Sequence, residues 1–254
     1  MTSLSLAHWA MLVSAALFAG MVDALAGGGG LVTLPALLST GMPPHLALGT
    51  NKAQAIWGTS MALFTFVRAK KVSARFVRWA LPLGFVGAVI GARSVVAVSP
   101  SALRVAVMVL LAAAALFVWR QRSTTVTDQQ PPVRRVGVVV AVFVIGAYDG
   151  FLGPGTGTFL IAALAFWGHA GLASASAHAK VVNLASNAAA LAIFAWFQHV
   201  SWGVALPMAA AQLVGGRIGA YLVLRHGGRF VRLLVMLVTG ALLVKLGVDL
   251  CRAW

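Results

Sequence analysis

Long apolar runs separated by short polar or basic segments fill most of the chain. Two of these runs share an unusual ending, in which an aspartate is followed by a glycine-rich break and then by a short second apolar run. The first ending contains Asp23 and four glycines at 27–30, and the second contains Asp149 and the Gly-Pro-Gly-Thr-Gly segment at 153–157. In both cases a single lysine follows inside the next apolar run. This recurrence predicts a chain made of two similar halves.

The apolar runs predict ten helical elements, five in each half. They are residues 8–26, 31–40, 50–67, 76–97 and 101–119 in the first half, and residues 134–152, 157–167, 178–198, 202–223 and 229–250 in the second. The second run of each half is too short to cross a bilayer, because about ten residues rise only about 15 Å as a helix against a hydrocarbon core of about 30 Å. Each half is therefore predicted to contain a helical hairpin whose glycine break lies inside the membrane.

The composition places these elements in a membrane. Of the 254 residues, 61% are hydrophobic and only 9% are charged, and the mean hydropathy is +0.94. Repeated apolar runs of about 20 residues are typical of helices that cross a bilayer. The predicted fold class is therefore an all-α polytopic membrane protein whose partner is the lipid bilayer. The formal net charge of +15 does not indicate nucleic-acid binding, because the lysines and arginines cluster between the apolar runs.

The basic residues in the loops predict the orientation of the halves. Five lysines and arginines lie at 68–78 and four at 120–135, which predicts that both segments are cytoplasmic. The second-half equivalent of the first loop, at 199–201, has neither lysine nor arginine, whereas the loop at 224–229 contains two arginines. The charge pattern has therefore changed sides, which predicts two inverted-topology repeats. With five elements in each repeat, both termini are predicted to be periplasmic.

The spacing of matched residues defines the two repeats. Asp149 follows Asp23 by 126 positions, and Lys180 follows Lys52 by 128 positions. The predicted division is a first transmembrane repeat at 1–120, a cytoplasmic linker at 121–133 and a second transmembrane repeat at 134–254.

The two glycine breaks also predict a binding site for a small anion. A helix that begins after a break has free N–H groups and a partial positive charge at its start, and glycine lets a ligand approach the backbone. The lysines add full positive charges, and amides and hydroxyls near them add hydrogen-bond donors. The residues predicted to bind the substrate are Gly29, Gly30, Thr33, Asn51, Lys52, Gln54, Gly155, Thr156, Gly157, Thr158, Lys180, Asn183 and Asn187. No cofactor or metal site is expected, because the sequence contains no cluster of metal-ligating residues.

Other interpretations of the same residues remain open. The glycines could serve close helix packing, and the asparagines could join helices through hydrogen bonds. The lysines, which lie near the starts of the predicted runs, could extend to the membrane interface. Asp23 and Asp149 are expected to be charge partners of Lys52 and Lys180, and coupling to a proton or cation is the alternative. If the lysines bind substrate, replacing either with methionine is expected to abolish anion binding and to leave folding intact.

Four motifs together carry a resemblance to a known family. They are Asp-x-x-x-Gly-Gly-Gly-Gly at 23–30 with Pro35, Gly-Thr-Asn-Lys at 49–52, Gly-Pro-Gly-Thr-Gly at 153–157, and Ala-Lys-Val-Val-Asn at 179–183 with Asn187. In combination they resemble the TSUP family, the TauE/SafE group of sulfite and organosulfonate exporters, over nearly the whole chain. The resemblance implies a bacterial inner-membrane permease for sulfite, thiosulfate or small sulfonates such as sulfoacetate. It places weight on Asn51, Lys52, Gly155, Thr156, Lys180 and Asn183.

One difference between the halves predicts an asymmetric site. The first half has Ala55 and Thr59 where the second half has Asn183 and Asn187. The second half is therefore expected to supply more contacts to the ligand.

The function expected from these features is export of small sulfur-containing anions by alternating access around a central site. An enzyme is not expected, because the sequence shows neither a nucleophile–base pair nor a metal-ligand cluster. Two alternatives stay open. One is a proton- or cation-coupled permease for another small anion, and the other is a membrane assembly factor that transports nothing.

Overall fold

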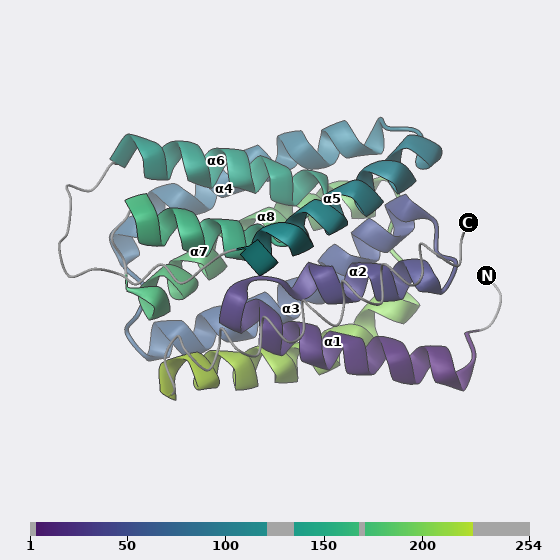
Figure 1. Cartoon of the computed structure of the whole chain (residues 1–254), viewed down its shortest axis with the longest axis horizontal. Helices are drawn as coiled ribbons and strands as arrows, with labels where there is room; N and C mark the ends of the chain where they lie inside the picture. Colours follow the sequence, from purple (N-terminus) through teal and green to yellow (C-terminus); the bar gives the residue numbers. More distant parts are fainter. Residues whose placement is uncertain (1–3, 121–134, 168–170, 226–254) are drawn as a thin grey trace.

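The computed structural model describes residues 4–120, 135–167 and 171–225, and the elements in these ranges are helices (Figure 1). The predicted all-α fold class is confirmed for these residues. The predicted linker at 121–133 and the last predicted span at 229–250 lie outside the described residues.

The helices follow the predicted order of elements. The first half contains α1 (Leu6–Ala26), α2 (Gly29–Ser39), α3 (Pro44–Arg68), α4 (Ala74–Val96) and α5 (Pro100–Arg120). The second half contains α6 (Arg135–Phe151), α7 (Thr156–Trp167), α8 (Leu172–Trp196) and a further helix at 202–225. Three of these helices, at Leu6–Ala26, Ala74–Val96 and Ala173–Trp196, are long and apolar enough to cross a membrane. This supports the predicted membrane class.

Two helices begin earlier than the apolar pattern predicts. α3 begins at Pro44 instead of residue 50, and α8 begins at Leu172 instead of residue 178. Proline at the first position of α3 suits a helix start, because its missing N–H would have no intrahelical partner there. As a result, Lys52 and Lys180 lie about two turns inside their helices and not at the helix starts.

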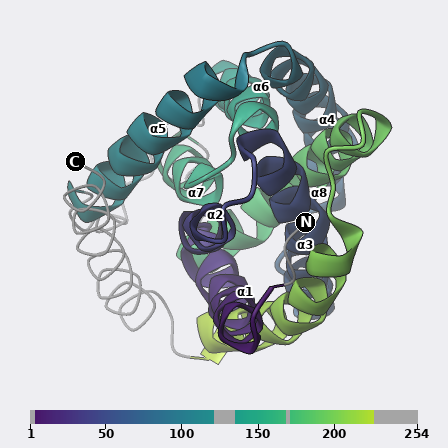
Figure 2. The same ribbon diagram turned by 90° about the vertical axis from the view of Figure 1, so that its right-hand side faces the viewer.

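The short helices lie in the interior of the molecule. Viewed end-on, α2 and α7 lie between α1, α5 and α6 (Figure 2). The largest apolar cluster joins both halves, because it contains Leu12 of α1, Leu37 of α2, Leu103 of α5, Phe194 of α8 and Met208 of the helix at 202–225. This core holds the two hairpins in place around the centre.

Backbone contacts in the two halves occur in matched pairs. The Lys71 N–H donates to the Phe66 carbonyl at 3.0 Å, and the His199 N–H donates to the Phe194 carbonyl at 2.7 Å. Both residues of the second pair lie 128 positions after those of the first. The ends of α3 and α8 are therefore built in the same way, which supports the predicted repeat.

Helix crossings between the halves are matched as well. Gly87 of α4 packs on the Phe143 carbonyl of α6, and Gly215 packs on the Leu17 carbonyl of α1. The glycines are 128 positions apart and their partners are 126 positions apart, which are the offsets that relate the lysines and the aspartates. For these glycines, close packing is the role that the structure shows.

The direction of the helices is consistent with the predicted inversion. In Figure 1, α1 begins at the right and runs to the left, whereas its counterpart α6 begins at the left and runs to the right. Opposite directions are what inverted repeats require. The orientation of the halves across a membrane stays a prediction.

Candidate functional site

The two glycine breaks cross each other at the centre of the molecule. The Gly157 N–H donates a hydrogen bond to the Gly27 carbonyl at 3.1 Å, and Thr158 Oγ1 donates to the Ala26 carbonyl at 2.6 Å. A Cβ atom on Gly27 would collide with the backbone of Gly157, and Gly27 has a φ of +76°. Glycine is therefore required at residue 27 for two separate reasons, its backbone conformation and the space available.

A helix begins directly after each break. α2 begins at Gly29 and α7 begins at Thr156, close to the predicted starts at residues 31 and 157. The first N–H groups of a helix have no partner within that helix, and its start carries a partial positive charge. Both helix starts therefore favour negative charge near the crossing point.

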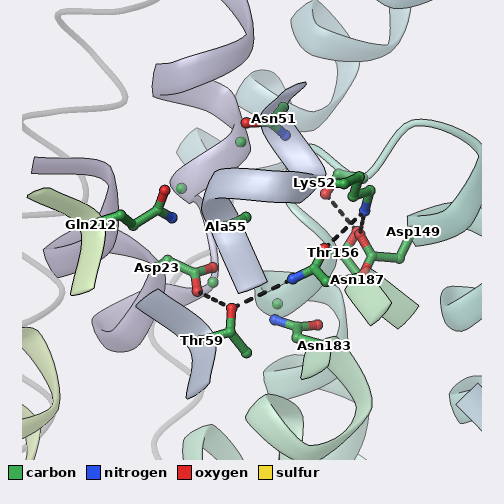
Figure 3. Close-up of a pocket in the computed structure, with 15 residues that line it drawn as sticks. Asp23, Asn51, Lys52, Ala55, Thr59, Asp149, Thr156, Asn183, Asn187 and Gln212 are labelled. Atoms are coloured by element: carbon green, nitrogen blue, oxygen red, sulfur yellow. Dashed lines mark hydrogen bonds and ion pairs between the residues drawn. The ribbon is translucent and has the colours of Figure 1, made fainter. Parts of the chain in front are cut away.

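A small cavity lies where the breaks cross (Figure 3). Its volume is about 30 Å³, more than the ~10–15 Å³ that a single water requires. The lining combines glycines, amides, a lysine and two carboxylates: Asp23, Gly27, Gly29, Gly30, Asn51, Lys52, Ala55, Thr59, Asp149, Gly153, Thr156, Gly157, Asn183, Asn187 and Gln212.

Each lysine pairs with the aspartate of the other half. Lys52 Nζ lies 2.6 Å from Asp149 Oδ1, and Lys180 Nζ lies 2.8 Å from Asp23 Oδ2. The Lys52 and Lys180 side chains are 2% and 0% exposed. The lysines therefore do not extend to the membrane interface, and the alternative based on their position near helix starts is wrong. The expected role of the aspartates as charge partners agrees with these contacts.

The pair formed by Lys52 belongs to a larger hydrogen-bond network. Lys52 also donates to Asn187 Oδ1 at 3.1 Å, and Thr156 Oγ1 donates to Asp149 Oδ1 at 3.1 Å. The Ser186 hydroxyl donates to the second Asp149 oxygen. These bonds come from α3, α6, α7 and α8, so this network ties together both halves of the molecule.

Most of the predicted ligands line the cavity. From the first half these are Gly29, Gly30, Asn51 and Lys52, and from the second half they are Thr156, Gly157, Asn183 and Asn187, together with Asp23 and Asp149. Their contact with a substrate stays a prediction.

Five predicted ligands lie outside the cavity lining and support residues within it. Thr33 Oγ1 donates to Asn51 Oδ1 at 2.5 Å, and Gln54 Nε2 donates to the same oxygen at 3.0 Å. Thr158 binds the first break, and Lys180 holds Asp23. Gly155, with a φ of +79°, shapes the second break.

Sequence reasoning missed two polar residues at the site. Gln212 lines the cavity from the helix at 202–225, and Ser186 binds Asp149 from α8. The available signals were a lone glutamine inside an apolar run and a serine directly before Asn187. Neither recurs at the matched position of the first half, so the repeat did not draw attention to them.

The family model described as "Sulfite exporter TauE/SafE" matches residues 12–246. The chain belongs to this family. Its relatives include a "Probable membrane transporter protein ORF9" of Sinorhizobium sp, 35% identical over 94% of this chain and 92% of that protein. The Escherichia coli K12 "Probable membrane transporter protein YfcA" is 37% identical over 92% of this chain and 87% of its own length. A "Probable membrane transporter protein" of Haemophilus influenzae is 34% identical over 94% of both chains.

Membership in the TauE/SafE family confirms the suspected resemblance and assigns the chain to a class of membrane transporters. No solved structure matches this chain. Among the described residues, no group of three or more histidine, cysteine or acidic side chains could hold a metal ion.

Proposed function

We propose that this protein transports small sulfur-containing anions such as sulfite, thiosulfate or sulfoacetate out of the cell. The family is described as a sulfite exporter family, and the three relatives are named as probable membrane transporters. The identity of the anion and the direction of transport belong to the proposal.

The cavity at the crossing of the glycine breaks is the observation that carries this proposal. Two helix starts, the Lys52 ammonium group and the amides of Asn183 and Asn187 converge there. Helix starts and lysines bind oxyanions through N–H donors and positive charge. The small volume of the cavity favours an inorganic oxyanion or a short sulfonate over a larger organic substrate.

The two ion pairs define how an anion would enter. Because each lysine is paired with an aspartate, the four charges cancel in pairs. An anion that binds Lys52 competes with Asp149 for the ammonium group. We infer that this exchange, at the point where both breaks meet, lets the halves move relative to each other in alternating access.

Export of an anion agrees with the electrical force on it. An inside-negative membrane potential favours outward movement of negative charge by about 2.3 kcal/mol per charge per 100 mV. Efflux across the inner membrane therefore needs no coupling ion. In this topology both termini are periplasmic and the linker at 121–133 is cytoplasmic.

A coupled permease is the second candidate, and the position of Asp23 favours it. Asp23 lines the cavity and its side chain is 14% exposed, against 5% for Asp149. A carboxylate at a wet cavity can take up a proton. Proton movement that accompanies anion flux in liposomes, and is lost in Asp23→Asn, would favour this candidate over uncoupled efflux.

The first test is thermal stabilisation of the purified protein by sulfite, thiosulfate, sulfate, sulfoacetate, taurine, acetate and chloride. A ligand that binds only the folded state raises the melting temperature. We expect a rise that is confined to one or two sulfur oxyanions and is lost in Lys52→Met. Equal melting temperatures with all seven compounds, together with no flux of labelled sulfite or sulfoacetate in liposomes, would refute the proposal.

A further inference from the structure

Gln212 is a buried polar side chain that enters the cavity from outside both hairpins. It lies on the helix at 202–225, is 1% exposed and lines the cavity. In Figure 3 its amide points into the site from the side of Asp23, whereas Lys52 and Asp149 lie on the opposite side. Among the described residues, its Oε1 atom has no hydrogen-bond partner.

Two glycines let Gln212 pack closely against the first half. A Cβ atom on Gly58 of α3 would lie 2.5 Å from Gln212 Cγ, and one on Gly20 of α1 would collide with the Gln212 backbone carbonyl oxygen and lie 3.0 Å from Cγ. Any larger residue at either position would push Gln212 out of its place. Glycine at residues 20 and 58 of the first half therefore leaves the space in which Gln212 reaches the cavity.

The repeat does not require a glutamine at this place. The position matched to Gln212, 128 residues earlier, is Gly84, whose own Cβ would lie 2.9 Å from Val182. The position matched to Gly58 is Ser186, which binds Asp149. The second half therefore places an amide at residue 212, where the first half has a glycine. If the side chain only filled space, an apolar residue would do so without burying an unpaired carbonyl oxygen.

We propose that Gln212 binds the part of the substrate far from Lys52 and selects anions that carry a second polar group there. This inference rests on the proposed function of the same site. The amide can donate to an oxygen of a second anionic group. If the side-chain amide rotates by about 180°, its oxygen takes the place of its nitrogen and can accept a hydrogen bond from a hydroxyl or ammonium group.

The lining between the two ends contains an apolar side chain. Lys52, Ala55 and Thr59 follow one face of α3 and all line the cavity, and Ala55 lies between Gln212 and Lys52 in Figure 3. A sulfonate group would bind at Lys52, one or two methylene groups would contact Ala55, and the second polar group would reach Gln212. The substrate class is therefore short two-ended sulfonates, with sulfite as a weaker ligand.

The test measures dissociation constants of sulfoacetate and sulfite for the unaltered protein, Gln212→Met and Met208→Leu. Methionine keeps nearly the same length and removes both hydrogen-bonding groups. Met208 is fully buried one turn earlier on the same helix and does not line the cavity, so its variant controls for repacking. We expect Gln212→Met to weaken sulfoacetate binding about tenfold and sulfite binding less than about threefold, with Met208→Leu unchanged for both.

A second variant reverses the selectivity and does not depend on a loss of binding. In Gln212→Glu a carboxylate of the same shape faces the second polar group. We expect this variant to prefer taurine, whose second group is an ammonium, over sulfoacetate, whose second group is a carboxylate. This reversal would support the assignment even if Gln212→Met did not fold.

The possible failures can be told apart. Unchanged sulfoacetate binding in Gln212→Met, or an equal loss for both anions, would overturn the role of Gln212 and leave the anion site at Lys52 standing. Binding of sulfite but not sulfoacetate by the unaltered protein would overturn the substrate class. Binding of neither anion would overturn the proposed function and this inference together.

Discussion

The two carboxylates that pair with the lysines occupy matched positions but have different surroundings. Asp149 binds Lys52 at 2.6 Å and also accepts hydrogen bonds from Thr156 and Ser186. Asp23 binds Lys180 at 2.8 Å and also accepts a long hydrogen bond of 3.4 Å from Thr59. Both carboxylates line the cavity, but Asp149 is held by more partners and is 5% exposed, whereas Asp23 is 14% exposed.

Residues on α3 and α8 explain this difference. At two successive positions α8 has Ser186 and Asn187, where α3 has Gly58 and Thr59. The serine supplies a hydroxyl to Asp149, but the glycine supplies none to Asp23 and instead leaves space for Gln212. The repeat thus keeps both ion pairs and varies the groups around them, which makes the site asymmetric. Substitutions at matched positions can test how far the halves differ.

The largest expected effect comes from the crossing that joins the halves. In Gly27→Ala the new methyl group would collide with the Gly157 backbone, and alanine would be strained at a φ of +76°. Strain of this kind costs about 1–3 kcal/mol, and the collision adds to it. We expect loss of folded protein in detergent, measured by size-exclusion chromatography and thermal unfolding.

The neighbouring glycine is a matched control for this change. A Cβ atom on Gly28 would lie 3.5 Å from Val22, an ordinary contact, and its φ of −102° suits alanine. Gly28→Ala should fold normally. Equal behaviour of the two variants would contradict the assigned crossing of the breaks.

The next effect concerns the ion pair of Lys52 with Asp149. Lys52→Met removes the cation and leaves Asp149 buried without it, which typically costs about 3–5 kcal/mol. The sequence-based expectation that this change leaves folding intact therefore needs revision. We expect a lower melting temperature together with loss of anion binding.

A double variant separates these two effects. Lys52→Met with Asp149→Asn removes both charges, so much of the stability should return while anion binding stays lost. Recovery of anion binding in the double variant would show that Lys52 is a structural residue and not a ligand.

A smaller effect should distinguish the two aspartates. Asp149→Asn removes an ion pair and weakens bonds from two hydroxyls, whereas Asp23→Asn removes an ion pair and weakens one long bond. Because a hydrogen bond to a charged group contributes about 1.5–3 kcal/mol, Asp149→Asn should be the less stable variant by about that amount. Chemical unfolding of both variants under the same conditions measures the difference, and equal stabilities would mean that the two sites are energetically alike.

The smallest effect lies in the matched connections at the ends of α3 and α8. The first contains Lys71 and the second contains His199, whose ring lies 5.1 Å from the ring of His45. Burial, and secondly the charge of His45, lowers the pKa of His199. The folded state therefore disfavours the protonated ring, whereas the unfolded chain takes up a proton below about pH 6.5.

The sign of the pH effect follows from this difference in proton uptake. The contribution of His199 to stability is complete above about pH 6.5 and is lost as the pH falls below that value. Melting temperatures at pH 7.5 and 5.5 should differ less in His199→Gln than in the unaltered protein. The effect should be small because His199 is partly exposed, and an identical pH dependence in both proteins would contradict the assignment.

Much of the fold could be predicted because its signals are local. The length of an apolar run and a cluster of glycines indicate a helix and its break without knowledge of neighbours. The starts of α3 and α8 were placed six residues too late, although the segments at 44–49 and 172–177 are as apolar as the runs that follow them. Contacts with other helices bury much of these segments, and the apolar pattern alone does not show such contacts.

The sequence by itself determined that this is a helical membrane protein with two hairpins, two glycine breaks and two acid–base pairs in related halves. Only the tertiary structure decided that Lys52 pairs with Asp149, that Lys180 pairs with Asp23, and that Gln212 reaches the same cavity. Such contacts join residues that are distant in the chain, and they depend on how helices cross in space. The spacing of residues along one helix sets which face they share, but the helix that packs on that face is selected by shape and charge across the whole molecule.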